Sequence, residues 1–145
     1  MRLRNATDSD LTQVQTLLTA SDLPVDGVAE HLADFLVAEN NGRIQGVIGL
    51  ERYGSRGLLR SAVVARDARG SGIGGQLVNK LLERAKSSGV EDLYLLTTTA
   101  EKYFPRFGFE ATTRAEVPVS VQQSVEFRGA CPETAVVMRR SLGDS

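Results

Sequence analysis

The chain has 145 residues, of which 41% are apolar and 24% charged, and its formal net charge is −1. These values are typical of one globular domain, and we expect a single domain over residues 1–145. The near-neutral charge predicts no general attraction to nucleic acid or to an anionic membrane, and the apolar runs are too short to span a bilayer.

The cysteine and histidine content restricts the chemistry further. A single cysteine, Cys131, cannot form an internal disulfide, and the first ten residues lack the apolar segment of a secretory signal, so a cytoplasmic location is expected. Cys131 is interpreted as a structural thiol, with a nucleophile as the alternative. The only histidine, His31, has no neighbouring ligands that would complete a zinc site, so no metal is expected.

The first half of the chain predicts a strand, two helices and a β-hairpin. Residues 2–7 form the strand, and residues 8–21 form a helix with one apolar stripe and an acidic or serine cap. Residues 22–35 contain a turn and a weaker second helix. Two strand-like runs within residues 35–54 flank Asn40-Asn41-Gly42, which tolerates positive φ and therefore indicates a hairpin.

The second half predicts an α/β arrangement. A strand over residues 57–65 precedes a helix over residues 72–88 and a strand over residues 91–99. These two strands are nearly all apolar, which is typical of parallel strands covered on both faces. A short helix over residues 100–107 and two final strands, within residues 108–114 and 134–142, complete the fold. A less regular stretch lies between those last two strands.

The turn between the strand and the long helix carries the clearest functional pattern, in the sequence VVARDARGSGIGGQLVNKLL. Glycines at a strand-to-helix corner let backbone N–H groups and the helix dipole converge on an anion, and Arg66 and Arg69 add positive charge. The alternative is that the glycines only turn the chain. The motif also fits G-x-G-x-x-G, but the acidic residues that follow, Glu91 and Asp92, precede the next strand, so a dinucleotide site is disfavoured.

The segment RGSGIG, residues 69–74, is similar to the R/Q-x-x-G-x-G/A signature of the GNAT acetyltransferase family, and AEKYFPRFGFE resembles the short helix and final strand of that family. The resemblance implies an α/β fold with a mixed, mostly antiparallel sheet whose central parallel pair splays to bind acetyl-CoA. It also implies about four flanking helices and about six or seven strands. Members of this family often dimerise, so a homodimer is an expected partner. The implied acetyl-CoA-binding residues are Val63, Val64, Ala65, Arg69, Gly70, Ser71, Gly72, Ile73, Gly74, Thr97 and Phe104.

The catalytic groups of the family are only partly present. Acetyl transfer needs a base for the amine and an acid for the leaving thiolate. The usual strand glutamate falls on Leu58, so Glu51 is the substitute base, with a solvated hairpin carboxylate as the alternative. The usual tyrosine position is Phe104, and Tyr103, one residue earlier, is the candidate acid or else a packed aromatic.

The substrate is inferred from Arg60, an arginine in an otherwise apolar strand. It is either half of a structural ion pair or a clamp for a substrate anion, with Ser61 and Arg52 as further substrate-binding candidates. The stretch LYLLTTTAEKYFPRFGF resembles amino-acid N-acetyltransferases, and GLERYGSRGLLRSAVV together with CPETAVVMRRSL resembles an arsenic-resistance branch. The resemblance implies a glutamate-like acceptor such as arsinothricin or phosphinothricin. Direct transfer is expected because no well-placed nucleophile supports a covalent acetyl-enzyme. The alternatives are a non-catalytic acyl-CoA-binding domain and a peptide N-acetyltransferase.

Overall fold

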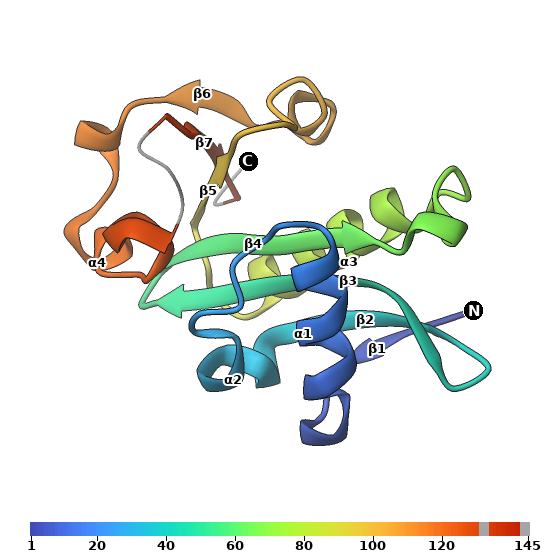
Figure 1. The fold of residues 1–145 in the computed structure, drawn as a ribbon. Helices are drawn as coiled ribbons and strands as arrows, with labels where there is room; N and C mark the ends of the chain where they lie inside the picture. Colours follow the sequence, from blue (N-terminus) through green and yellow to red (C-terminus); the bar gives the residue numbers. More distant parts are fainter. Residues whose placement is uncertain (131–133, 143–145) are drawn as a thin grey trace. The chain divides into compact units, whose positions relative to one another are not determined.

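The computed structural model describes residues 1–130 and 134–142. It divides into two compact units: a first unit of residues 1–50 and 61–81, and a second unit of residues 51–60 and 82–145. The strands hydrogen-bond in the order β1-β2-β3-β4-β5-β7-β6 in a seven-stranded sheet (Figure 1). The expected α/β class with a mixed sheet is therefore confirmed. Cys131 lies outside the described residues.

The first unit begins with three strands and the helices between them. β1 (Arg2–Asn5) pairs antiparallel with β2 (Phe35–Asn40), which pairs antiparallel with β3 (Arg43–Tyr53). The connection from β1 to β2 contains the short 3-10 helices η1 (Asp8–Asp10) and η2 (Leu32–Asp34) and the helices α1 (Leu11–Ala20) and α2 (Val28–His31). Asn41 and Gly42 have φ angles of 54° and 78°, which confirms the hairpin predicted from this pair.

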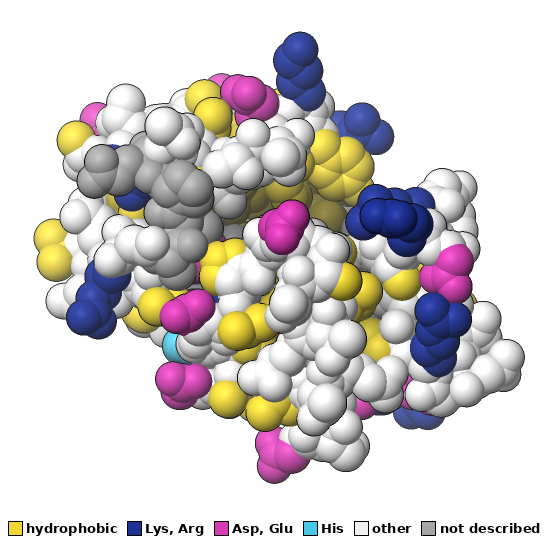
Figure 2. Space-filling model, in the orientation of Figure 1, with side chains coloured by type: hydrophobic (Ala, Val, Ile, Leu, Met, Phe, Trp, Pro, Cys, Tyr) yellow, Lys and Arg dark blue, Asp and Glu magenta, His cyan; other side chains and the backbone are white. Residues whose placement is uncertain are grey.

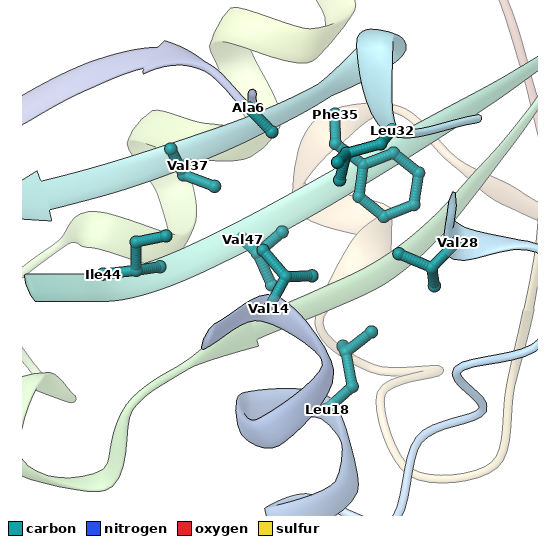
Figure 3. Close-up of a cluster of buried hydrophobic side chains, with 9 residues drawn as sticks. All are labelled: Ala6, Val14, Leu18, Val28, Leu32, Phe35, Val37, Ile44 and Val47. Carbon is teal, nitrogen blue, oxygen red and sulfur yellow. The ribbon is translucent and has the colours of Figure 1, made fainter. Parts of the chain in front are cut away.

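The core of the first unit lies between α1 and the antiparallel strands. Figure 3 shows Val14 and Leu18 of α1 pointing toward the sheet, on the side where Val47 and Phe35 are buried. The opposite face of β3 receives the start of α3 (Ile73–Ser87), because a Cβ at Gly46 would lie 3.0 Å from Leu77 Cδ1. The sheet of the first unit is thus covered by helices on both faces, as its apolar strands predict.

The Phe35 ring occupies the space that a side chain at position 49 of β3 would need, so only glycine fits there. A Cβ at position 49 would overlap Cζ of Phe35, whose side chain is fully buried. We expect Gly49→Ala to lower the free energy of unfolding by about 1–3 kcal/mol, because a methyl group at position 49 would force the buried ring to shift against its neighbours. Chemical denaturation measures the loss. In a Phe35→Leu background the same substitution should cost much less, and an equal cost in both backgrounds would refute this packing account.

A buried carboxylate anchors the start of η1. Nη1 and Nη2 of Arg4 donate to Oδ2 and Oδ1 of Asp10 at 2.7 and 2.9 Å, and the Thr7 N–H donates to Oδ2 at 2.7 Å. The hydrogen bonds from Arg4 lower the pKa of Asp10 from 3.8 to about 2. The ionised form is therefore favoured in the folded protein.

This shift predicts acid sensitivity. A carboxylate whose pKa is depressed on folding contributes stability above its unfolded pKa, and that stability is lost as the pH falls through the folded value. We expect Asp10→Asn to lower the free energy of unfolding by about 1–2 kcal/mol at pH 7, with the difference disappearing between pH 5 and pH 2. Urea denaturation at several pH values tests this, and a pH-independent difference would contradict it.

The second unit contains the start of β4 (Arg56–Val64) and all of β5 (Asp92–Thr97), β6 (Glu110–Thr112) and β7 (Val136–Ser141). β4 and β5 pair in parallel from Arg56 opposite Asp92 to Leu58 opposite Tyr94, as predicted for the strand–helix–strand segment. β7 pairs antiparallel with both β5 and β6. No helix among the described residues is long and apolar enough to cross a membrane.

Two segments differ from the sequence-based expectation. The expected helix over residues 100–107 is only a 3-10 turn, η4 (Phe104–Phe107), which ends at Gly108 with a φ of 88°. The less regular stretch before β7 instead holds the 3-10 turn η5 (Arg114–Glu116), the short helix α4 (Val119–Gln122) and the π-helical turn η6 (Glu126–Ala130). Val117 and Val121 of this stretch pack with Leu58 and Tyr94 in a core of the second unit, so tertiary packing orders a segment of weak local pattern.

Candidate functional site

The glycine turn of the first unit joins the end of β4 to α3. After the 3-10 turn η3 (Arg66–Ala68), Gly70 and Gly72 adopt φ angles of 85° and 86°, and Ile73 begins the helix. A Cβ at either glycine would meet open space, so the left-handed backbone and not crowding is what favours glycine there. The Gln76 N–H donates to the Gly72 carbonyl at 3.1 Å, so the amides ahead of it point out of the helix start.

Side chains of the turn brace its backbone. Nε of Arg69 donates to the Val64 carbonyl at 3.0 Å, and the Ser71 hydroxyl donates to the Ala68 carbonyl at 2.6 Å. Arg66 and Arg69 are exposed, and Figure 2 shows Lys and Arg side chains near the end of β4 and the following loop. The amides of the helix start, including that of Gly74, together with this positive charge suit a phosphate.

The end of β4 is partly engaged within the first unit. The Ala65 N–H donates to the Gln45 carbonyl of β3 at 2.7 Å, and Val63 packs against the core beside α1. The Val64 carbonyl accepts from Arg69 but keeps a second lone pair. Of the three residues predicted to contact the pantetheine arm, Ala65 thus has its amide bonded on the β3 side.

A buried cluster of charged groups lies in the second unit. Nη1 of Arg60 donates to Oε2 of Glu51 at 2.7 Å, and Nε of Arg60 lies 3.4 Å from Oε2 of Glu126. The Tyr53 hydroxyl donates to the other Glu51 oxygen, Oε1. Glu51, Arg60 and Glu126 are 1%, 2% and 3% exposed. The structure therefore joins the predicted base and the predicted substrate-binding arginine directly.

This geometry bears on the two interpretations of Arg60. The structure contains the ion pair of the first interpretation, because the Arg60 guanidinium contacts the carboxylates of Glu51 and Glu126. Removing one partner of a buried pair leaves an uncompensated charge, which makes such a cluster costly to break. The interpretation of Glu51 as a solvated hairpin carboxylate is wrong, because the side chain is buried.

The remaining candidate residues of the second unit lie around η4 and β5. Phe104 is buried with its ring 5.7 Å from that of Phe109, whereas Tyr103 is half-buried and its ring lies 5.3 Å from that of Phe107. The two aromatic residues, although adjacent in sequence, thus have different surroundings. The Thr97 hydroxyl oxygen accepts the N–H of Ala100 at 2.9 Å, so it caps the turn after β5.

Three other positions are also defined. Leu58, where the family carries a glutamate, is fully buried in the core of the second unit. Ser61 is buried with a φ of 60°, an unusual conformation for a residue other than glycine within a strand. Arg52 is exposed on β3. Among the described residues, no group of three or more His, Cys, Asp or Glu side chains could hold a metal ion.

Sequence reasoning missed Tyr53 and Glu126. Tyr53 follows Glu51 by two residues in a strand, a spacing that places both side chains on one face and could have indicated the pair. Glu126 lies in a stretch with no clear period, so its contact with Arg60 had no local signal.

The sheet topology, the glycine turn and the helix that follows give an α/β fold with a strand-to-helix turn whose geometry suits a phosphate. The chain belongs to the GNAT acetyltransferase family, because the family model described as "Acetyltransferase (GNAT) domain" matches residues 31–111. This confirms the family identified from the sequence and, with it, the expected class of acetyl-CoA-dependent acyltransferase.

Relatives in sequence carry acetyltransferase names. An uncharacterised N-acetyltransferase of Chlorobaculum tepidum is 29% identical over 78% of this chain and 75% of its own length. An amino-acid acetyltransferase of Ralstonia nicotianae is 32% identical over 80% of this chain, but the match spans only 28% of that protein. The chain therefore corresponds to a minor part of the amino-acid acetyltransferases that it resembles.

Solved structures agree on the fold. N-acetylglutamate synthase from Neisseria gonorrhoeae, complexed with coenzyme A and N-acetyl-glutamate, has a TM-score of 0.84 at 20% identity, covering 99% of this chain and 35% of that chain. A Mycobacterium tuberculosis structure in complex with CoA and NLQ has a TM-score of 0.82 at 22% identity, covering 97% of this chain and 99% of that one.

Proposed function

We propose that this protein transfers the acetyl group of acetyl-CoA directly to the amine of a small anionic amino acid. The observation that carries the proposal is the glycine turn at the start of α3, where two left-handed glycines precede the helix amides. That arrangement suits the pyrophosphate of coenzyme A. Family membership supports the same co-substrate.

The proposed cofactor contacts follow the chain from β4 to α3. Backbone amides of residues 69–74 would hold the pyrophosphate, and the backbone of residues 63–65 would bond to the pantetheine arm. Thr97 and Phe104 are proposed to line the same arm. Because the side chains of Arg69 and Ser71 brace the turn, their role at the pyrophosphate is to shape the backbone.

The proposed chemistry needs a base and an acid. Glu51 is the proposed base for the acceptor amine, and Tyr103 is the proposed acid for the leaving thiolate. Arg60, Arg52 and Ser61 are proposed to recognise the acceptor. Direct transfer is proposed because the sequence shows no serine or cysteine placed beside a histidine that would activate it as a nucleophile for a covalent acetyl-enzyme.

The proposed acceptor is a glutamate-like amino acid. The names of several relatives, which are called amino-acid acetyltransferases, support this class, as does the N-acetyl-glutamate bound in a protein of the same fold. Resemblance to the arsenic-resistance branch extends the proposal to arsinothricin and phosphinothricin, whose side chains carry an arsenic or phosphorus oxyacid.

A thiol-release assay with acetyl-CoA tests the substrate class. Glutamate, phosphinothricin and arsinothricin would be compared with neutral amino acids, basic amino acids and peptides at equal concentrations. The proposal predicts the highest kcat/KM for an acidic amino acid. Higher kcat/KM for a peptide would favour the peptide acetyltransferase instead.

Leu58 supports a second candidate, a non-catalytic acyl-CoA-binding domain, because it replaces the family glutamate with a buried apolar side chain. Calorimetry with acetyl-CoA separates the two. Tight binding without thiol release on any acceptor would support the binding domain.

A further inference from the structure

Glu51 is enclosed on both sides of its carboxylate. Oε2 accepts from Arg60 at 2.7 Å, Oε1 accepts from the Tyr53 hydroxyl, and the residue is 1% exposed. A general base must come within hydrogen-bond distance of the proton that it removes, or act through an intervening group. Glu51 therefore needs a neighbour that passes the proton to it.

Tyr53 is the neighbour with the required geometry. It lies two residues after Glu51 on β3, so both side chains leave the strand on the same face, and it is half-buried where Glu51 is buried. Burial and the hydrogen bond to Glu51 raise the pKa of Tyr53 well above its usual value. The phenol thus stays protonated and donates to Glu51, and a phenol oxygen that donates can also accept a proton.

We propose that Tyr53 and Glu51 form a two-step proton relay that deprotonates the acceptor amine, an inference that rests on the proposed acetyltransferase function. An ammonium proton of the acceptor moves to Oη of Tyr53 while the Tyr53 proton moves to Oε1 of Glu51. The N–H bond electrons remain on nitrogen as the lone pair that attacks the acetyl carbonyl. The new C–N bond forms as the acetyl C–S bond breaks, and the departing coenzyme A thiolate takes the second amine proton. Glu51 then returns its proton to solvent through Tyr53.

Arg60 and Glu126 act in this relay as positioning residues. Arg60 uses two different nitrogens, Nη1 toward Glu51 and Nε toward Glu126, so its planar fork fixes the Glu51 carboxylate in one orientation. The charged groups that act on Tyr53 are Glu51 from β3, Arg60 from β4 and Glu126 from η6. Tyr94 of β5 is the further titratable side chain in the adjoining core.

The relay predicts a characteristic effect of Tyr53→Phe. We expect kcat/KM for the acceptor to fall about 100-fold, because general-base catalysis of this kind contributes on that order, with acetyl-CoA affinity unchanged. The pH profile should also change. Without the relay only the unprotonated form of the acceptor amine can react. The kcat/KM of the variant should therefore keep rising with pH up to the pKa of the acceptor amine, whereas the kcat/KM of the wild type should level off at lower pH.

Tyr94→Phe is the matched control, because it removes a tyrosine hydroxyl of the same core that interacts with Arg139, and it should leave both rate and profile unchanged. A double variant sharpens the test. If Tyr53 and Glu51 act as one unit, Tyr53→Phe combined with Glu51→Gln should be no slower than the slower single variant.

The outcomes separate the relay from the proposed function. A wild-type rate and pH profile in Tyr53→Phe, or multiplicative losses in the double variant, would overturn the relay while acetyl transfer by the wild type still stands. Absence of turnover by the wild type on every amine would overturn both. Circular dichroism of each variant ensures that the loss is kinetic and not due to unfolding.

Discussion

Replacing Gly72 with alanine should weaken acetyl-CoA binding at least tenfold. A residue with a Cβ in the left-handed region costs about 1–2 kcal/mol, and relief of that strain would rotate the amides that open α3 away from the phosphate. Gly72 has a φ of 86° and open space where a Cβ would lie, so the effect is conformational and not steric. Isothermal titration calorimetry with acetyl-CoA gives the affinity.

Gly42 provides the control for Gly72. It has a φ of 78° and the same open surroundings, but it lies in the β2–β3 hairpin. Gly42→Ala and Gly72→Ala should therefore lose similar amounts of folding stability, while only Gly72→Ala loses affinity for acetyl-CoA. Equal affinities in the two variants would remove the glycine turn from the cofactor site.

Replacing Arg60 with alanine should lower the free energy of unfolding by about 3–5 kcal/mol, the cost of breaking a buried ion pair. The substitution would leave Glu51 and Glu126 buried without the guanidinium between them. Arg139→Ala is the comparison within the second unit, because Arg139 pairs with Asp92 at 2.5 Å but is 45% exposed. Arg139→Ala should lower the free energy of unfolding by less than about 1 kcal/mol. Equal losses in denaturant unfolding would contradict the energetic importance of burial.

Arg60→Lys separates the roles of Arg60 in catalysis. Lysine keeps the charge but cannot hold two carboxylates in a planar fork. If Arg60 positions Glu51, kcat should fall while KM for the acidic acceptor stays nearly constant. If Arg60 instead clamps the acceptor anion, KM should rise and kcat should persist.

Local chemistry made much of the fold predictable. The Asn41-Gly42 turn, the apolar run that became β4 and the glycines before α3 each have a conformational preference that nearby residues reinforce. The 3-10 turn at Phe104 and the ordered α4 and η6 segments were not predictable in the same way. Pro105 and Gly108 restrict the length of the 3-10 turn, and contacts with core residues distant in sequence order the segment that contains α4 and η6.

The candidate site shows the same division. Gly70 and Gly72 were recognisable from their spacing, because the φ they adopt is a property of the residue itself. Glu51 and Arg60 were both selected from the sequence, but their mutual ion pair depends on how two strands are placed in three dimensions. Glu126 was not selected, because nothing near it in the sequence indicates that it contacts Arg60.

The most direct test of acetyl transfer follows the label from acetyl-CoA that is isotopically labelled in its acetyl group. After incubation of the full chain with glutamate, phosphinothricin and arsinothricin, mass spectrometry would examine both the acceptors and the protein. We predict labelled acetyl on the amine of an acidic acceptor and none on the protein. Labelled acetyl-protein that forms and decays during turnover, or no labelled acceptor at all, would contradict direct transfer to an amino acid.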